Sequence, residues 1–262
     1  MQNRSIEIVD GDDTYNFDEV QHAHMLNGKP LKGNTTLIDL TLAKPAITPW
    51  AVKTTIDWIK NNCTVSPIGG GYLVSDSDLE NAKKEYTKKK TDAGDWGSRV
   101  HNACEIWCKT GILPSESEDI YKSVSNFVTF IENNGFRVLD TERPVWSKEW
   151  WMGGIFDLVL EKDGKVYIAD IKTSSGIYDS HFIQMGGYYK CLVERDWVKN
   201  YGVSDFTGAI VINLKKDNTI AWCSSEALDS MVECFSGIIA IHKNKDVLEK
   251  VTKAVRYGTN FY

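Results

Sequence analysis

The sequence predicts an α/β (α+β) fold in which helices flank a mixed central sheet, preceded by a mostly helical N-terminal extension. Two observations support this class. Between residues 48 and 134 apolar side chains recur at helical spacing, whereas from Phe136 onward they alternate or run together as in strands. A single helix-like segment interrupts the run of strands, which is typical of a mixed sheet.

The N-terminal part is expected to begin with irregular β structure up to Leu40. Thr48 and Pro49 then predict the start of a helix, because a hydroxyl N-cap and a proline in the first turn favour helix initiation. A polar helix is expected to begin at Ser77, which has the capping-box spacing to Glu80. Its end is expected near residue 90, and further helices are expected over residues 94–111 and 118–134.

The second part predicts strands over residues 136–146, 151–162, 165–173, 207–214 and 219–224. A helix over residues 182–198 separates the third strand from the fourth, and a long helix from about Glu226 follows the fifth. No linker-like segment divides the chain. We therefore predict one domain over residues 1–262, with an extension over residues 1–92 and a core over residues 93–262.

The composition is that of an ordinary globular chain, with 42% hydrophobic and 25% charged residues. No apolar run approaches a membrane span and no signal-peptide stretch is present, so cytoplasmic residence is expected. The formal net charge of −6 argues against a protein that coats nucleic acid by bulk electrostatics. The six cysteines include no C-x-x-C pair, which argues against a zinc ribbon.

The most informative segment is GGIFDLVLEKDGKVYIADIKTS. Asp163-Gly164 between two β-rich runs predicts a tight hairpin, since a two-residue primed turn needs positive φ at both central positions. If the loop is those two residues, counting outward along both strands places Asp157 opposite Asp170. Residues two apart share a strand face, so Lys172 projects from the same face as Asp170.

Two facing carboxylates repel each other, and their neighbours on the same face, such as Ile155 and Ile168, are apolar. A divalent cation between Asp157 and Asp170 would remove this cost, and hard oxygen ligands suit one or two Mg²⁺ or Mn²⁺ ions. Lys172 would then act on a water or a phosphate beside the metal. The alternative is a surface hairpin with scattered charges.

Four short motifs follow one another along the chain. They are GSRVH ending at His101, GIFD ending at Asp157, DIK ending at Lys172 and QMGGY ending at Tyr188. Their order and spacing resemble the RecB-like branch of the PD-(D/E)XK nucleases. The segment TTLIDLTLAKPAITPWAVK also resembles the lead-in of phage-type exonucleases of that branch, and the resemblance spans residues 30–195.

The resemblance implies a restriction-endonuclease-like fold, dependence on Mg²⁺ or Mn²⁺, and hydrolysis of phosphodiester bonds. The metal ligands that it implies are His101, Asp157, Asp170 and the carbonyl of Ile171. Some relatives hold an iron–sulfur cluster through one cysteine before the core and three after it. The closely spaced trailing cysteines are absent from this sequence, so no cluster is expected.

The resemblance also implies roles for residues around the metal. Lys172 would orient the attacking water or stabilise charge on the phosphate. Gln184 and Tyr188, one helical turn apart and so on one face, would position the lysine or the DNA strand. Glu105 and Glu142 have counterparts in many members of this nuclease branch. They would orient the metal ligands without binding the metal themselves.

Other candidates are weighed against simpler roles. A basic run could flank DNA phosphates, although charge runs on helices are usually solvated faces. Its members are Lys83, Lys84, Lys88, Lys89 and Lys90. Tryptophans could stack on bases of an unpaired strand, although packing in a core is the commoner role. They are Trp96, Trp146, Trp150 and Trp151.

The predicted function is therefore a metal-dependent DNA exonuclease that acts in recombination, repair or replication. The resemblance to phage-type exonucleases implies that it is phage-encoded and acts in the host cytoplasm. The alternatives are a structure-specific endonuclease that cuts flaps or junctions, a non-cleaving DNA-binding or assembly module on the same fold, and a divalent-binding protein without a nucleic acid substrate. Single- or double-stranded DNA is the expected partner. A homo-oligomer or a recombination or replication protein is a possible further partner.

Overall fold

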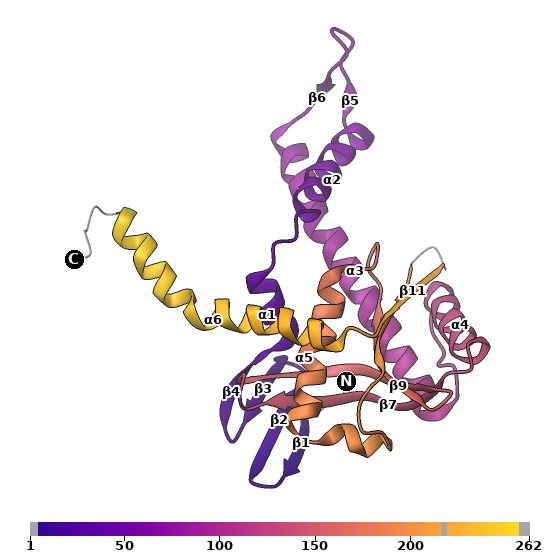
Figure 1. Cartoon of the computed structure of the whole chain (residues 1–262). Helices are drawn as coiled ribbons and strands as arrows, with labels where there is room; N and C mark the ends of the chain where they lie inside the picture. The colour runs from indigo at the N-terminus through magenta and orange to yellow at the C-terminus, as the bar shows by residue number, and fades with distance from the viewer. Residues whose placement is uncertain (1–4, 216–218, 257–262) are drawn as a thin grey trace. The chain divides into compact units, whose positions relative to one another are not determined.

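The computed structural model describes residues 5–215 and 219–256 (Figure 1). The described residues fall into two compact units: the chain up to Leu42 with the chain from Ala103 onward, and Ala43–Asn102. The single domain with an extension ending at residue 92 stays a prediction. Among the described helices, none combines the length and apolar character that a membrane span requires.

The strands predicted beyond Phe136 are all present and form the centre of a nine-stranded sheet. They are β7 (Arg137–Ser147), β8 (Met152–Lys162), β9 (Lys165–Lys172), β10 (Gly208–Leu214) and β11 (Ile220–Ser225). β8 runs antiparallel between β7 and β9. β10 then joins β9 in parallel, and β11 pairs antiparallel with β10.

The β structure predicted for the N-terminal segment is present as an antiparallel meander up to Gly33, but the prediction of β structure over residues 34–40 was wrong, because that segment is helical. The strands of the meander are β1 (Ser5–Asp10), β2 (Asp13–Asp18), β3 (Ala23–Leu26) and β4 (Lys29–Gly33). The last of them pairs in parallel with the start of β8, so that Gly33 lies beside Gly153. Helix α1 (Asn34–Thr41) follows directly, which brings its first turn to the central sheet.

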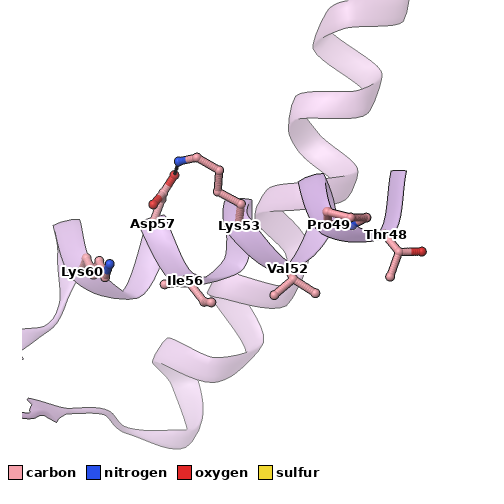
Figure 2. A pocket seen from close by; sticks show the side chains of 7 residues that line it. All are labelled: Thr48, Pro49, Val52, Lys53, Ile56, Asp57 and Lys60. Carbon is pink, nitrogen blue, oxygen red and sulfur yellow. Dashed lines mark hydrogen bonds and ion pairs between the residues drawn. The ribbon is translucent and has the colours of Figure 1, made fainter. Parts of the chain in front are cut away.

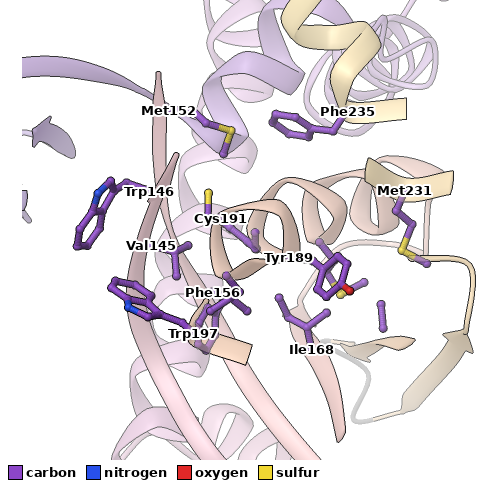
Figure 3. Packing of buried hydrophobic residues seen from close by; sticks show 14 of the residues in the cluster. Val145, Trp146, Met152, Phe156, Ile168, Tyr189, Cys191, Trp197, Met231 and Phe235 are labelled. Carbon is purple, nitrogen blue, oxygen red and sulfur yellow. The ribbon is translucent and has the colours of Figure 1, made fainter. Parts of the chain in front are cut away.

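Helices cover the central sheet and confirm the predicted fold class, a mixed sheet flanked by helices (Figure 1). α5 (Asp179–Glu194) packs across β7, β8, β9 and β10, and α6 (Leu228–Arg256) packs on α5. Figure 3 shows part of the apolar cluster that these elements share, to which the sheet contributes Phe156 and Ile168, α5 contributes Tyr189 and α6 contributes Met231. Each such buried side chain contributes about 1.5–3 kcal/mol to stability.

The remaining elements of this unit are α4 (Glu118–Asn133) and the short 3₁₀ helix η1 (Trp197–Tyr201). α4 packs against β10, and the Phe130 ring lies 5.5 Å from the Trp222 ring of β11. α4 ends as predicted, because Gly135 takes a left-handed conformation with φ +68° and closes the last turn.

The second unit contains α2 (Ile47–Asn62), the short strands β5 (Thr64–Val65) and β6 (Tyr72–Leu73), and the first part of α3 (Asp76–Thr110). The prediction of two helices between residues 77 and 111 was wrong, because α3 is continuous. A glycine inside a helix costs only about 1 kcal/mol. Gly94 was therefore too weak a signal for a helix end.

The predicted capping box was also wrong by two residues. Helix α3 begins after Ser75, whose hydroxyl accepts the backbone N–H of Asp78 at 3.2 Å. The Asp78 carboxylate in turn accepts the backbone N–H of Ser75 at 3.0 Å. An aspartate thus performs the reciprocal role that the sequence interpretation gave to Glu80.

One side of α2 is open to solvent. Figure 2 shows the residues along it, which are Thr48, Pro49, Val52, Lys53, Ile56, Asp57 and Lys60. Lys53 Nζ and Asp57 Oδ2 lie 2.5 Å apart, and an exposed pair of this kind contributes little to stability. This surface holds a single carboxylate, so it is not a candidate metal site.

A glycine on α5 permits the close approach of α6. A Cβ on Gly186 would lie 2.3 Å from the backbone carbon of Met231. We expect Gly186→Ala to lower the free energy of unfolding by about 1–3 kcal/mol, because the helices must separate. Gly237→Ala on α6 is the control, since a Cβ there meets nothing within 4 Å. Thermal denaturation of both variants checks this, and equal midpoints would contradict it.

Candidate active site

The hairpin between β8 and β9 confirms the register predicted from its turn. Asp163 and Gly164 have φ values of +52° and +76°, as a primed two-residue turn requires. The flanking residues pair as expected, from Lys162 opposite Lys165 to Leu158 opposite Ala169. The next residues outward on the two strands are Asp157 and Asp170.

The backbone pairing of β8 and β9 ends before these aspartates, and the side chain of Asp157 supplies the hydrogen-bond acceptor there. The backbone N–H of Ile171 donates to Asp157 Oδ2 at 2.7 Å, and a hydrogen bond joins the carboxyls of Asp157 and Asp170. Burial raises the pKa of Asp157 to about 6, against the lowering effects of Lys172 and these hydrogen bonds. The pair therefore holds a proton more tightly than a solvated aspartate does.

Lys172 lies over the same face. Its Nζ is 2.7 Å from Asp170 Oδ2, and the Asp170 side chain is only 2% exposed. Burial opposes the charge of the ammonium group, but the carboxylates of Asp170 and Asp157 outweigh it and raise the pKa of Lys172. Lys172 is therefore a partly buried cation, 19% exposed, whose charge two nearby acids stabilise.

Glu142 reaches this group of acids through an irregularity in β7. The register between β7 and β8 shifts by one residue between Val138 and Asp140. After the shift Thr141 faces Leu158 and Arg143 faces Phe156, so the residue between them, Glu142, comes opposite Asp157. Glu142 lies within the strand predicted over residues 136–146, and the structure places it within β7.

The backbone and the charge of Glu142 are both unusual. It has φ +50°, a left-handed conformation that costs a residue other than glycine about 1–3 kcal/mol and is enriched at functional sites. Burial and the neighbouring charges of Asp157 and Glu105 raise its pKa to about 9. Glu142, Asp157 and Asp170 thus form a row of acids across three adjacent strands.

Helix α3 supplies the histidine of the first motif. His101 belongs to the second unit, whereas Glu142 and Asp157 belong to the first, so the role of His101 as a metal ligand stays a prediction. Helix α3 continues without interruption from His101 to Glu105, which pairs with Lys109. The charge of Glu105 contributes to the raised pKa of Glu142, so this acid lies beside the row.

Gln184 and Tyr188 of α5 join Lys172 in a hydrogen-bond chain. Lys172 Nζ donates to Gln184 Oε1 at 2.9 Å, and Gln184 Nε2 donates to Tyr188 Oη at 2.9 Å. Gln184 Nε2 also donates to Thr35 Oγ1 at 3.0 Å. A Cβ on Gly154 would lie 2.5 Å from the Tyr188 ring, so this motif glycine is needed for the tyrosine to pack.

Thr35 is a residue that the sequence interpretation missed. It lies in the first turn of α1, and its neighbour Asn34 donates to the backbone carbonyl of Gln184 at 3.0 Å. The available signal was the resemblance of the TTLIDL segment to an exonuclease lead-in. That resemblance covers the whole segment and did not indicate which of its side chains lies in the site.

The other predicted residues are described by their own surroundings. The five lysines of α3 are exposed, and Lys83 and Lys89 pair with Glu80 and Glu85 on the same helix. Their contact with DNA stays a prediction. Trp146 is fully buried and stacks on Tyr15, which supports the simpler role in the core for this tryptophan.

The row of acids suits a hard divalent cation. Burial raises the pKa values of Asp157 and Glu142, and neighbouring acids raise the pKa of Glu142 further, so a cation that neutralises these carboxylates relieves an existing cost. The donors within this unit are carboxylate oxygens, which Mg²⁺ and Mn²⁺ both accept. The residues present therefore fit the metal that the motifs imply.

Comparisons with known proteins give distant structural likenesses. No protein-family model matches the chain, and no curated protein matches it. The chain is similar to the solved structure of SSO0001, with 16% identity and a TM-score of 0.29 over 48% of this chain and 56% of that one. The chain thus spans little more than half the length of that protein.

A second solved structure is the alkaline exonuclease LHK-Exo from Laribacter hongkongensis. The identity is 9% and the TM-score 0.35, over 71% of this chain and 89% of that chain. At these values neither likeness carries residue roles to this chain. Roles follow only from the site's own geometry.

The raised pKa values predict how the stability of the metal-free protein depends on pH. Both carboxyls bind a proton more tightly in the folded chain than in the unfolded chain. The cluster therefore stabilises the fold below the ordinary carboxyl pKa, and this stability is lost as the pH rises through about 6 for Asp157 and about 9 for Glu142.

Thermal midpoints measured in EDTA between pH 5 and pH 9 check this prediction. Glu142→Gln is expected to fall less steeply with pH than the parent protein, because one titrating group is gone. Added Mn²⁺ is expected to flatten the profile of the parent. Parallel profiles for the parent and Glu142→Gln would contradict the assignment.

Proposed function

We propose that this protein is a divalent-metal-dependent deoxyribonuclease that hydrolyses DNA phosphodiester bonds, acting as an exonuclease in recombination, repair or replication. One observation carries the proposal. Glu142, Asp157 and Asp170 stand side by side on three strands, and Lys172 is held against Asp170 at 2.7 Å. A group of acids with one partly buried lysine suits the hydrolysis of a phosphate ester.

The carboxylates of Asp157 and Asp170, with Glu142, would hold the cation, and His101 and the Ile171 carbonyl would complete its surroundings. A bound Mg²⁺ or Mn²⁺ lowers the pKa of a water ligand and neutralises charge on the phosphate. The position of Glu142 opposite Asp157 supports a direct role in holding the cation. Glu105 would then act on the metal site indirectly, through the effect of its charge on Glu142.

Lys172 is proposed to orient the attacking water and to stabilise the charge that develops on the phosphate oxygens. Its ammonium group is fixed by Asp170 and Gln184, so little reorganisation is needed during the reaction. Gln184 and Tyr188 would keep the ammonium group of Lys172 in the orientation that this role requires. Their hydrogen-bond chain ends at Thr35, in an element that packs on the same sheet.

Digestion of end-labelled DNA tests this function. Linear and circular substrates, each single- and double-stranded, would be incubated with Mg²⁺, with Mn²⁺ or with EDTA. An exonuclease is expected to degrade linear DNA in the presence of metal and to leave covalently closed circles intact. Cutting of circles would instead favour a structure-specific endonuclease. Binding without cleavage of any substrate would refute the proposal and favour a DNA-binding module.

A further inference from the structure

A buried amide next to Lys172 lacks hydrogen-bond partners. The side chain of Asn213 is 0% exposed, and neither its Oδ1 nor its Nδ2 has a partner among the residues that the structure describes. Every residue of β10 is buried, and its other members are glycine, alanine or aliphatic. A buried amide without partners destabilises a fold, so an apolar residue would suit this position better unless the amide has a function.

The register of the sheet places Asn213 beside Lys172. β9 and β10 are parallel, with Asp170 next to Val211 and Lys172 next to Asn213. Register partners on neighbouring strands lie roughly 4.8 Å apart and direct their side chains to the same face. Asn213 and Lys172 therefore share the face that carries Asp170. No hairpin links these two strands, because α5 lies between them in the chain.

Metal binding would change the surroundings of Lys172. Its ammonium group forms an ion pair with Asp170 Oδ2 at 2.7 Å and donates a hydrogen bond to Gln184 Oε1 at 2.9 Å. If Asp170 binds a divalent cation, as the proposed function requires, that cation competes with the ammonium for the same carboxylate and repels it. Lys172 then needs an acceptor without charge, because a third acid would again attract it away from the phosphate.

We infer that Asn213 is a positioning residue whose Oδ1 receives a hydrogen bond from Lys172 when a cation occupies Asp170. Gln184 and Asn213 then hold the ammonium from α5 and from β10, and the lysine stays directed at the reacting phosphate. The inference rests on the proposed function. The unpartnered amide therefore destabilises the metal-free protein, whereas its hydrogen bond with Lys172 stabilises the metal-loaded protein.

Two variants of nearly equal shape test this inference. Asn213→Val removes both polar atoms, whereas Asn213→Thr keeps a hydroxyl oxygen that can accept from the lysine. In EDTA, Asn213→Val is expected to melt about 2–4 °C above the parent protein, because a buried polar group without partners is gone. A lower melting midpoint would show that Asn213 is structural, for instance through a buried water, and would overturn the inference.

The affinity for Mn²⁺, measured by calorimetry without DNA, gives the second readout. We expect Asn213→Val to bind Mn²⁺ about tenfold more weakly than the parent, since the displaced ammonium loses an acceptor. Asn213→Thr is expected to stay within about threefold of the parent. In a Lys172→Met background, Asn213→Val is expected to have no further effect. An unchanged affinity in the single variant, or an equal loss in the double variant, would overturn the inference.

Kinetics on linear DNA give the third readout. Asn213→Val is expected to lower kcat by about 10- to 100-fold with little change in KM, because the lysine acts on the reacting phosphate rather than on DNA binding. Full kcat would overturn the inference. If the parent binds Mn²⁺ with the expected variant pattern but cleaves no DNA, the proposed function fails and the positioning role remains. If the parent binds no Mn²⁺, both fail.

Discussion

Asp170→Asn is expected to lower the rate of DNA cleavage by about a thousandfold or more and to abolish tight Mn²⁺ binding. Asp170 is 2% exposed and is adjacent to both Asp157 and Lys172. Asparagine keeps the size of the side chain but removes the negative charge that attracts the cation. It also leaves Lys172 with less compensation, so a modest loss of stability is expected in EDTA.

Asp196→Asn is the matched control. Asp196 has φ +56°, a conformation that asparagine adopts readily, and its exposed carboxylate pairs only with Lys199 among the interactions known in the described chain. Its cleavage rate and Mn²⁺ affinity are expected to equal those of the parent. Rates and calorimetric affinities for the three proteins check the prediction. An Asp170→Asn variant with normal Mn²⁺ affinity would remove Asp170 from the metal site.

Lys172→Met is expected to lower kcat by about 10²- to 10⁴-fold while Mn²⁺ binding is retained or strengthened. The reason lies in the 2.7 Å contact between Lys172 and Asp170. The lysine acts in the reaction, but it also competes with the cation for the same carboxylate. Methionine keeps the length of the side chain and removes this competition.

The opposite responses of metal affinity separate the roles of Asp170 and Lys172. Lys199→Met serves as the control, because the Lys199 side chain is 70% exposed and lies outside the site. Single-turnover cleavage and Mn²⁺ calorimetry would be measured on the same preparations. Weaker Mn²⁺ binding in Lys172→Met would mean that the lysine supports the cation, and its assigned role would have to change.

The part of the site that local chemistry determines could be predicted from the sequence. The turn at Asp163 and Gly164 permits one tight geometry, and that geometry sets the register of every residue back to Asp157 and Asp170. Gln184 and Tyr188 are one helical turn apart, so their shared face also follows from the sequence alone.

Contacts that depend on long-range pairing could not be predicted. Glu142 comes opposite Asp157 only because β7 gains one residue between Val138 and Asp140, and a one-residue shift moves a side chain to the other face. No turn sequence marks that shift. Asn213 likewise lies beside Lys172 in a parallel pairing of β9 and β10, whose register no hairpin turn determines.

The limits of helix prediction were of a different kind. Gly94 lies inside α3 although it suggested a boundary, since helix propensity is weak beside the hydrogen bonds of the turns on either side. Thr35 contacts Gln184 because β4 pairs with β8 at Gly33, immediately before α1 begins. Neither the continuity of α3 at Gly94 nor the position of Thr35 can be predicted from a short segment of sequence.

The central claim is that Glu142, Asp157 and Asp170 hold a divalent cation beside Lys172. Crystals of the protein soaked in Mn²⁺ and measured for anomalous scattering test it most directly. We predict an anomalous peak between the carboxylates of Asp157 and Asp170, at metal–oxygen distances of about 2.0–2.4 Å. A fully soaked crystal with no peak at these acids, or with its peak at another group of ligands, would contradict the account.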